Sequence, residues 1–443
     1  MIRKMERKKV LIITWSLPPR PNVSSLRLRG LAKYLTDYNW TPIILTGELP
    51  EGSRIDCRTV ETPYHDVVGS WKRKFGFDPN RSMKAQTKLI SDKESFKNSL
   101  VEFALNRVGE IIAYPDSEKG WYAYAIKYAR KILEGEDVDA VISSSRPVTC
   151  HLIAKQLKEE YKIPWIADLR DLWTQNYYYS YSIMRRVIER RLEKKTLSQA
   201  DALVTVSQPL ADKLKELHKE QAVYAITNGF DPDEMNTLPK NLTPKFTITW
   251  TGTIYYGRQD PLRILAATRS LISDGAIDPS DIEIRFYGMV TNDRDWWLEE
   301  KIRQLGLQNV AKFYGQIPRE EAIEKQRTSQ VLLLLEWEGP SQGVYTGKIF
   351  EYLAARRPML ATGGPQEVVA ELLEETQAGI HAPNVEDVKS ALKKFYYEYK
   401  SDGQVKYKGK KSKIDKYSHK EMARKFSEIL NILTGTSTSN GGT

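Results

Sequence analysis

The chain has 443 residues, of which 41% are hydrophobic and 28% are charged, as in an ordinary soluble globular protein. This length predicts two or three domains, each with its own core. No segment approaches the ~20 apolar residues of a membrane span, and no signal-peptide cleavage site follows the first apolar run. Two cysteines, Cys57 and Cys150, stand far apart, and the five histidines form no cluster. We therefore expect a cytoplasmic protein in a reducing compartment, with no metal and no cofactor.

The positive charge is concentrated in one segment. The formal net charge is +10, and residues 400–425 contain ten lysines and arginines against three acids. Such a segment suits a polyanion or an anionic membrane, which would place the protein peripherally at the inner membrane face. The alternative is a solvated linker without a partner.

Short apolar runs that alternate with amphipathic segments predict strands and helices in βαβ units. The expected strands are Val10–Trp15, Pro42–Thr46, Ala140–Ser143, Trp165–Asp168, Ala202–Val206, Val223–Thr227, Phe246–Thr251, Ile282–Tyr287, Ala311–Tyr314, Val331–Leu335, Pro358–Ala361 and Gly379–His381. The expected helices include Leu26–Tyr38, Tyr122–Leu133, Thr149–Tyr161, Met184–Leu197, Pro261–Ser273, Thr346–Arg356 and Glu386–Tyr399. Because the series runs twice, we predict an α/β protein with two doubly wound, Rossmann-like parallel sheets.

The first domain is expected to span residues 1–235 and the second residues 245–400, with a boundary near the proline-rich stretch Pro232–Lys245. Residues of about 47–120 break the alternation and are interpreted as an insertion over the first sheet. A final helix, 416–433, is expected to join the first domain, followed by a disordered tail, 434–443.

The segment 343–353 is a small-residue loop that leads into a helix. Lys348 lies at the expected helix start and Glu351 in its first turn. A helix start offers free N–H groups and a positive dipole end to a phosphate, Lys348 adds a charge, and the Glu351 carboxylate can accept both hydroxyls of a ribose. The alternative is a simple Lys348–Glu351 pair at i,i+3 spacing.

A P-loop is excluded for this segment. Gly347-Lys348 follows a strand, as in a Walker A motif, but Gln342 stands where glycine is needed and Ile349 where a metal-binding hydroxyl is needed.

The first domain carries charged residues after a strand, where open parallel sheets bind ligands. Asp168, Arg170 and Asp171 end the run Trp165–Trp173 and are candidates for chemistry or substrate contacts. The alternative is that Arg170 pairs with a neighbouring aspartate and fixes the loop.

Two strand-to-helix loops add candidates for phosphate binding. In the first domain, Ser24 or Ser25 can cap the following helix, and Arg27 stands where a cation opposes the helix dipole, which suggests a negative partner. In the second domain, Gly252 allows a flexible loop, and Arg258 can reach a diphosphate with its planar guanidinium.

Taken together, these motifs resemble the GT-B glycosyltransferases of the large retaining family 4, over nearly the whole length. The motifs are the Pro18–Arg27 loop, Ala167–Trp173, Asp201–Ser207 with Asn228–Asp231, Thr251–Tyr255 and Lys348–Pro358. The resemblance implies two domains that face a cleft, and a hexosyltransferase that moves a sugar from a UDP- or GDP-sugar to a glycan or lipid-linked acceptor, with retention of configuration.

The resemblance also assigns residues. Glu351 matches the second glutamate of the family's glutamate pair, which implies a contact with ribose, and Lys348, Arg258 and the amides near Thr346 and Gly347 would hold the diphosphate. The resemblance places Arg170 and Asp171 near the reaction centre, and Asp168 remains a catalytic candidate because of its place at the strand end. The resemblance implies that protein cations can replace a metal.

The chain departs from the family pattern at two places. Gly343 stands where the first glutamate of the pair is expected, which leaves the bound sugar open. Ser24 and Ser25 stand where many relatives have glycines.

Two other functions stay open at this point: a sugar-nucleotide epimerase on the same fold, and a non-enzymatic polyanion binder that uses residues 400–425. No nucleic-acid-binding motif accompanies that segment, so no nucleic-acid partner is expected.

Overall fold

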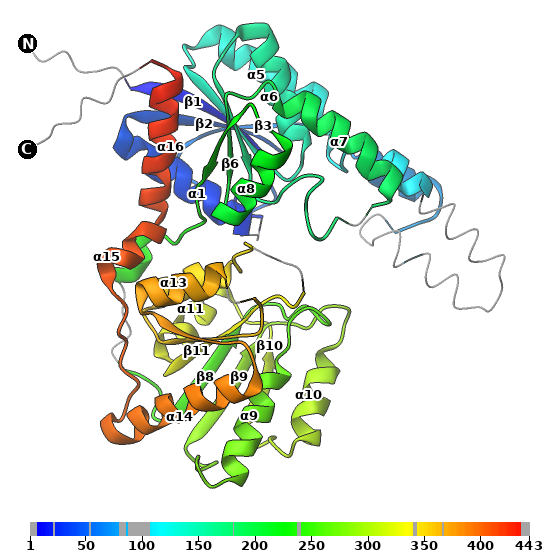
Figure 1. The fold of residues 1–443 in the computed structure, drawn as a ribbon. Helices are drawn as coiled ribbons and strands as arrows, with labels where there is room; N and C mark the ends of the chain where they lie inside the picture. Colours follow the sequence, from blue (N-terminus) through cyan, green and yellow to red (C-terminus); the bar gives the residue numbers. More distant parts are fainter. Residues whose placement is uncertain are drawn as a thin grey trace, which may run out of the picture. The chain divides into compact units, whose positions relative to one another are not determined.

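The computed structural model describes residues 7–20, 23–52, 55–78, 86, 107–179, 181–236, 241–339, 343–365 and 367–435. The chain divides into two compact units (Figure 1). The first comprises residues 1–226 and 423–443, and the second comprises residues 227–422. The division therefore falls ahead of the expected boundary at Pro232–Lys245, and the chain returns to the first unit within its last helix.

The first unit is built on a parallel sheet of seven strands in the order β3-β2-β1-β4-β5-β6-β7. The strands are β1 (Lys8–Thr14), β2 (Trp40–Gly47), β3 (Arg58–Thr62), β4 (Ala140–Ser145), β5 (Trp165–Leu169), β6 (Ala202–Thr205) and β7 (Ala222–Ala225). Because β1 lies between β2 and β4, the direction of winding reverses there. Ligands in such sheets bind at the carboxyl ends beside this reversal.

Helices cover both faces of the first sheet (Figure 1). The helices of this unit include α1 (Val23–Leu35), α2 (Val67–Lys74), α5 (Tyr122–Gly135), α6 (Thr149–Tyr161), α7 (Ile183–Leu197), α8 (Gln208–Leu217) and α16 (His419–Leu433). One core packs Leu11, Ile13 and Trp165 of the strands against Ala129 of α5 and Ile153 of α6.

The second unit repeats the plan with six parallel strands in the order β10-β9-β8-β11-β12-β13. These are β8 (Phe246–Thr251), β9 (Ile282–Tyr287), β10 (Ala311–Gly315), β11 (Val331–Leu335), β12 (Met359–Thr362) and β13 (Gly379–Ala382). Its helices are α9 (Leu262–Ser273), α10 (Asp295–Gln304), α11 (Arg319–Thr328), α12 (Lys348–Ala355), α13 (Val368–Thr376), α14 (Val385–Asp402) and α15 (Lys411–Ile414).

Strand β11 shows why this sheet is buried on both faces. Its sequence, VLLLL, has no polar residue. Leu333 joins the core beneath α9 and α14, whereas Leu332 and Leu334 join the opposite core beneath α12 and α13. A strand in the middle of a doubly wound sheet needs apolar side chains in both directions, so period-two alternation is lost.

Every strand expected from the sequence is present, within a few residues of its expected bounds. The α/β, doubly wound fold class is therefore confirmed. One strand was missed. Arg58–Thr62 lies inside the predicted insertion but forms the edge strand β3, which is only partly buried and carries charged residues, so no apolar run marked it.

The basic segment 400–425 is partly neutralised by acids from other parts of the second unit. Lys400 lies 2.9 Å from Asp281, Lys408 lies 3.2 Å from Glu398, and Lys416 lies 2.6 Å from Glu375. The net charge counted from the sequence of this segment therefore overstates the electrostatic field that the segment presents to a polyanion.

None of the helices in the described part of the chain combines the length and the hydropathy that a membrane span requires. Of the predicted disordered tail, 434–443, residues 436–443 lie outside the described residues.

Candidate active site

The second unit gathers its functional candidates at the reversal between β8 and β11. These strands pair in parallel, so their carboxyl ends meet at one edge of the sheet. Gly252 directly follows β8, Glu336 follows β11, and α12 begins at Lys348. The sheet topology therefore brings segments almost a hundred residues apart to one place, which is where a doubly wound sheet binds its ligand.

At this edge, Glu351 accepts hydrogen bonds from three side chains. Lys348 Nζ lies 2.8 Å from Glu351 Oε2, Gln326 Nε2 lies 3.4 Å from the same oxygen, and Arg319 lies 3.5 Å from Oε1. Burial alone would raise the pKa of Glu351, but the charges of Lys348 and Arg319 lower it below the usual value. The carboxylate is therefore ionised at neutral pH and retains acceptor capacity on Oε1.

The backbone at Gly252 is adapted to the Lys348 side chain. Gly252 has φ +135°, and a Cβ there would lie 2.8 Å from Lys348 Cε. Its neighbour Gly288 has φ +136°, and a Cβ there would collide with the Gly252 carbonyl oxygen. Both positions need glycine, because an L side chain is strained at this φ and has no space. The expected role of Gly252 as a flexible loop residue is thus replaced by a specific one: it makes room for Lys348.

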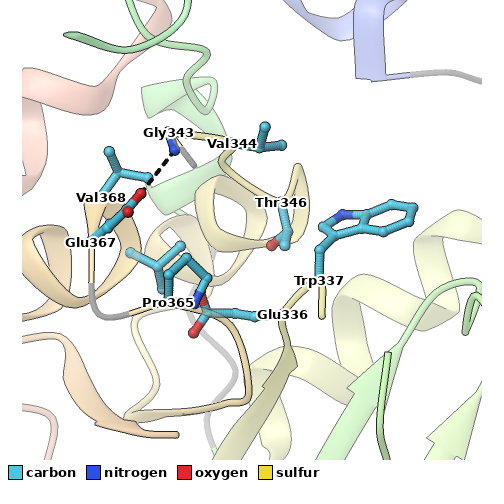
Figure 2. A pocket seen from close by; sticks show the side chains of 9 residues that line it. Glu336, Trp337, Gly343, Val344, Thr346, Pro365, Glu367 and Val368 are labelled. Atoms are coloured by element: carbon cyan, nitrogen blue, oxygen red, sulfur yellow. Dashed lines mark hydrogen bonds between the residues drawn. The ribbon is translucent and has the colours of Figure 1, made fainter. Parts of the chain in front are cut away.

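A small pocket lies beside the start of α12 (Figure 2). Its lining consists of Glu336, Trp337, Gly343, Val344, Thr346, Pro365, Glu367, Val368 and Val369. Figure 2 shows the Glu367 carboxylate directed to the backbone of Gly343, whose N–H donates to Glu367 Oε2 over 3.1 Å. A carboxylate thus lies beside position 343 although that residue is glycine.

Two polar groups of this pocket are buried. Thr346 is 6% exposed, and its hydroxyl has no hydrogen-bond partner within the described part of the chain. Such a group is a candidate ligand contact, because a buried hydroxyl without a partner costs free energy. The Glu336 carboxylate is 3.0 Å from His381 Nε2. Burial raises the pKa of Glu336, while the hydrogen bond and charge of Glu336 raise the pKa of His381 against the opposing effect of burial.

Arg258 lies on the exposed loop after β8. Its guanidinium stands 5.9 Å from the Trp337 ring centre, and its carbonyl accepts from Glu338 N over 2.6 Å. The structure therefore attaches Arg258 to the wall of the pocket, whereas Gly347 precedes α12 as its N-cap.

In the first unit, Arg27 and Asp168 form a fully buried ion pair. Arg27 Nη2 donates to Asp168 Oδ1 over 2.9 Å, Ser144 Oγ donates to Oδ2 over 2.8 Å, and Arg27 Nη1 donates to the Ile226 carbonyl over 3.1 Å. Both side chains of the pair are 0% exposed. The negative group that Arg27 was expected to face is thus Asp168, which ties α1 to the end of β5.

The remaining candidates of the first unit lie around this pair. Arg170 is 9% exposed and donates from Nε to the Ser145 carbonyl over 2.7 Å, so its hydrogen bond goes to the backbone and not to a neighbouring aspartate, which was the alternative interpretation. Burial lowers its pKa. Asp171 is exposed. Ser24 and Ser25 do not occupy the expected cap, because α1 already begins at Val23; Ser25 Oγ donates to the Arg20 carbonyl instead.

Sequence reasoning missed three residues of the second-unit site: Arg319, Gln326 and Glu367. Arg319 opens α11, where a cation opposes the helix dipole. That argument was applied to Arg27 and would have found Arg319 too. Gln326 and Glu367 carry no comparable local signal, because only the fold brings them to the site.

Residues 82–234 match a family model described as Glycosyltransferase Family 4. A comparison with curated protein sequences gives no significant match. One similar solved structure is sucrose-phosphate synthase from Thermosynechococcus elongatus, with 15% sequence identity and a TM-score of 0.60 over 97% of this chain and 100% of that chain. A second is HepE from Anabaena in complex with UDP and glucose, with 13% identity and a TM-score of 0.59 over 96% of this chain and 100% of that chain. A third is a glycosyltransferase from Rickettsia africae, with 17% identity and a TM-score of 0.58 over 97% of this chain and 100% of that chain.

At these identities the structural likeness establishes the fold, which is GT-B. The family match and the fold together identify the chain as a glycosyltransferase of the GT-B type. The predicted family resemblance and the assignment as a transferase are thereby confirmed.

Proposed function

We propose that this glycosyltransferase moves a sugar from a UDP- or GDP-sugar to a glycan or lipid-linked acceptor in the cytoplasm, with retention of configuration and without a metal ion. The observation that carries the proposal is the cluster of Lys348, Arg319 and Glu351 at the start of α12, beside the β8–β11 reversal. Cations, free helix N–H groups and an ionised carboxylate suit the diphosphate and ribose of a nucleotide.

Each part of the donor has a proposed partner. Lys348 and Arg258 contact the diphosphate together with the amides around Thr346 and Gly347, and Glu351 accepts from the ribose hydroxyls. Arg319 and Lys348 keep Glu351 ionised. HepE, which shares the fold, is a UDP complex, and this likeness supports UDP as the first nucleotide to test.

In the proposed reaction, the bond between the anomeric carbon and the diphosphate oxygen breaks. The acceptor hydroxyl oxygen forms the new bond to that carbon, and its proton leaves with the departing diphosphate. The negative charge that develops on the diphosphate is stabilised by Lys348 and Arg258, which is how protein cations would replace a metal. Retention rests on the family resemblance.

In the first unit, we propose that the three strand-end residues have different roles and do not all take part directly in catalysis. Asp171 is exposed and is the residue that can contact an acceptor. Asp168 reaches a substrate only if its bonds to Arg27 and Ser144 break, so it is proposed to fix the strand end on which Asp171 lies. Arg170 is held by the Ser145 carbonyl near the same edge.

A thermal-shift screen of UDP, GDP, ADP and their sugars tests the proposal. A nucleotide at about 100 times its Kd stabilises a protein by about 2.7 kcal/mol, which raises the melting temperature by about 5 °C or more. We expect this shift for UDP or GDP and not for ADP. No shift with any nucleotide would contradict the proposal.

Product analysis then separates transfer from epimerisation. Release of the nucleoside diphosphate is expected to rise with an added acceptor and to yield a glycosylated product. Formation of an epimeric sugar without an acceptor would favour the epimerase instead.

A further inference from the structure

Helix α7 has the reverse of the usual distribution of polar and apolar residues. Arg185, Glu189 and Glu193, spaced four residues apart, are at most 6% exposed. Ile183 and Met184 on the other side are 82% and 76% exposed. A surface helix normally buries its apolar side and exposes its charged side. The apolar residues in the first turns of α7 therefore lie outside the core of this unit, which takes Leu192 and Leu197 from the later turns of the helix.

Each buried charged side chain of α7 has at least one hydrogen-bond partner in the first unit. Arg185 Nε lies 2.6 Å from Glu189 Oε1, Trp173 Nε1 donates to Glu189 Oε2 over 3.1 Å, and the Thr174 amide donates to Glu193 over 3.1 Å. Figure 1 shows α7 along the outside of the first unit. These contacts fix the rotation of α7, so its apolar side is held outward.

The outward face has two halves. In the first two turns it presents Ile183, Met184, Val187 and Ile188, which are 82%, 76%, 50% and 49% exposed. Spacings of three and four residues continue this face into the basic residues Arg190, Arg191, Lys194 and Lys195, all exposed. In the described part of the chain, no carboxylate lies within 4.0 Å of these four cations, in contrast to the paired lysines of segment 400–425.

More apolar surface lies beside the N-terminal end of α7. Residues 107–112 form a helical segment that is tied to α7 by Ser182 Oγ, which donates to Glu110 over 2.8 Å. On this segment Ile111 is 72% exposed and Val108 is 40% exposed. The exposed apolar residues thus come from two adjoining helical segments.

We propose that the outward face of α7 docks on an anionic lipid membrane. The apolar half would enter the boundary between headgroups and acyl chains, and the basic half would contact lipid phosphates, as in interfacial amphipathic helices. The charge distribution disfavours a second copy of the chain as the occupant. Two-fold packing of α7 would place the basic half against either the same basic half or the partner's apolar half, and neither neutralises the cations.

Sedimentation of the full chain with lipid vesicles tests this proposal. The chain is expected to bind phosphatidylcholine vesicles that contain phosphatidylglycerol, more weakly as salt is raised, and to bind pure phosphatidylcholine much less. Equal binding to both kinds of vesicle, or to neither, would contradict the proposal.

Two pairs of variants locate the contact. Ile183→Ser with Met184→Ser is expected to lower the partition coefficient at least about tenfold, because both side chains would be buried in lipid. The matched control changes Tyr397→Ser and Ile432→Ser, which are 59% and 68% exposed elsewhere. It should leave binding unchanged, and an equal loss in this control would overturn the assignment to α7.

The second pair of variants separates the two basic segments. Arg191→Gln with Lys195→Gln should lower binding about 25-fold, at roughly fivefold for each cation. Lys411→Gln with Lys416→Gln should change it little, because these lysines already pair with Asp415 and Glu375. The reverse order of effects would place the contact on segment 400–425.

Sedimentation velocity without vesicles provides the last check. Concentration-dependent dimerisation that disappears in the Ile183→Ser, Met184→Ser variant would mean that a second copy covers this face, which contradicts the proposal.

Discussion

The two units each hold an ion pair at the carboxyl edge of the sheet, but in opposite environments. Arg27 and Asp168 of the first unit are 0% exposed, whereas Lys348 and Glu351 of the second unit are 30% and 16% exposed. A pair that is closed to solvent, such as Arg27–Asp168, can only stabilise the fold, because no ligand reaches it. An open pair can exchange one partner for a ligand, so sequence position at a strand end does not by itself distinguish a structural tie from a binding site.

The largest expected effect is at the closed pair. Asp168→Ala leaves the buried Arg27 guanidinium without its carboxylate, which should lower the free energy of unfolding by about 3–5 kcal/mol. Asp171→Ala is the matched control, since this neighbouring aspartate is exposed. Urea unfolding measures both. A loss below about 1 kcal/mol in Asp168→Ala would mean that the pair does not hold the strand end.

The open pair should affect binding more than stability. Lys348→Ala removes a charge-assisted contact to the proposed diphosphate and should weaken nucleotide affinity about 10- to 100-fold, which corresponds to about 1.5–3 kcal/mol. Lys325→Ala is the control, because Lys325 is 31% exposed and pairs with Glu321 in the same unit. Equal nucleotide affinities in the two variants, measured by calorimetry, would show that Lys348 does not contact the nucleotide.

The glycine beside the open pair offers a backbone test. Gly252→Ala places a Cβ at φ +135° and 2.8 Å from Lys348 Cε. The strain should destabilise the second unit by about 1–3 kcal/mol and displace Lys348, so nucleotide affinity should fall as well. Gly275→Ala has a similar backbone cost at φ +68° but open space around it, and it should leave affinity unchanged. An affinity loss of the same size in both variants would refute the specific role of Gly252.

The smallest expected effect is the pH dependence at the wall of the pocket. The folded-state pKa of His381 is raised, so its contribution to stability is complete below the ordinary imidazole value and is lost as pH rises through the folded value. The raised pKa of Glu336 acts in the same direction. Unfolding free energy of the second unit should therefore fall as pH rises from about 6 to about 8.

The His381→Gln variant should flatten this pH dependence, measured by urea unfolding across the same range. His65→Gln, at an exposed histidine of the first unit, is the control. Parallel profiles for wild type and His381→Gln would show that the pair does not titrate as described.

The fold and about half of the candidate site could be predicted from the sequence, for physical reasons. Runs such as VLLLL at 331–335 are apolar in both directions only in a central parallel strand, so the alternation with helices was legible. Strand β3 could not be predicted in this way, because an edge strand needs few apolar side chains. Lys348 and Glu351 were legible because both lie in one helical turn.

The rest of the site depends on tertiary structure. Arg319 and Gln326 come from α11, and Glu367 comes from the loop after β12, so no spacing within the sequence relates them to Lys348. Likewise, Arg27 was found in the first turn of a helix and Asp168 at the end of a strand, but their contact across 141 positions, which removes them from solvent, required the sheet to form.

The central claim is that a nucleotide binds at Glu351, and one titration tests it most directly. The nucleoside diphosphate selected by the thermal-shift screen is titrated calorimetrically into wild type, Glu351→Ala and the control Glu398→Ala, whose glutamate is 15% exposed and paired with Lys408. We predict that Glu351→Ala weakens affinity at least about tenfold, because a carboxylate that accepts two hydroxyls is lost, and that Glu398→Ala does not. Unchanged affinity in Glu351→Ala would contradict the account.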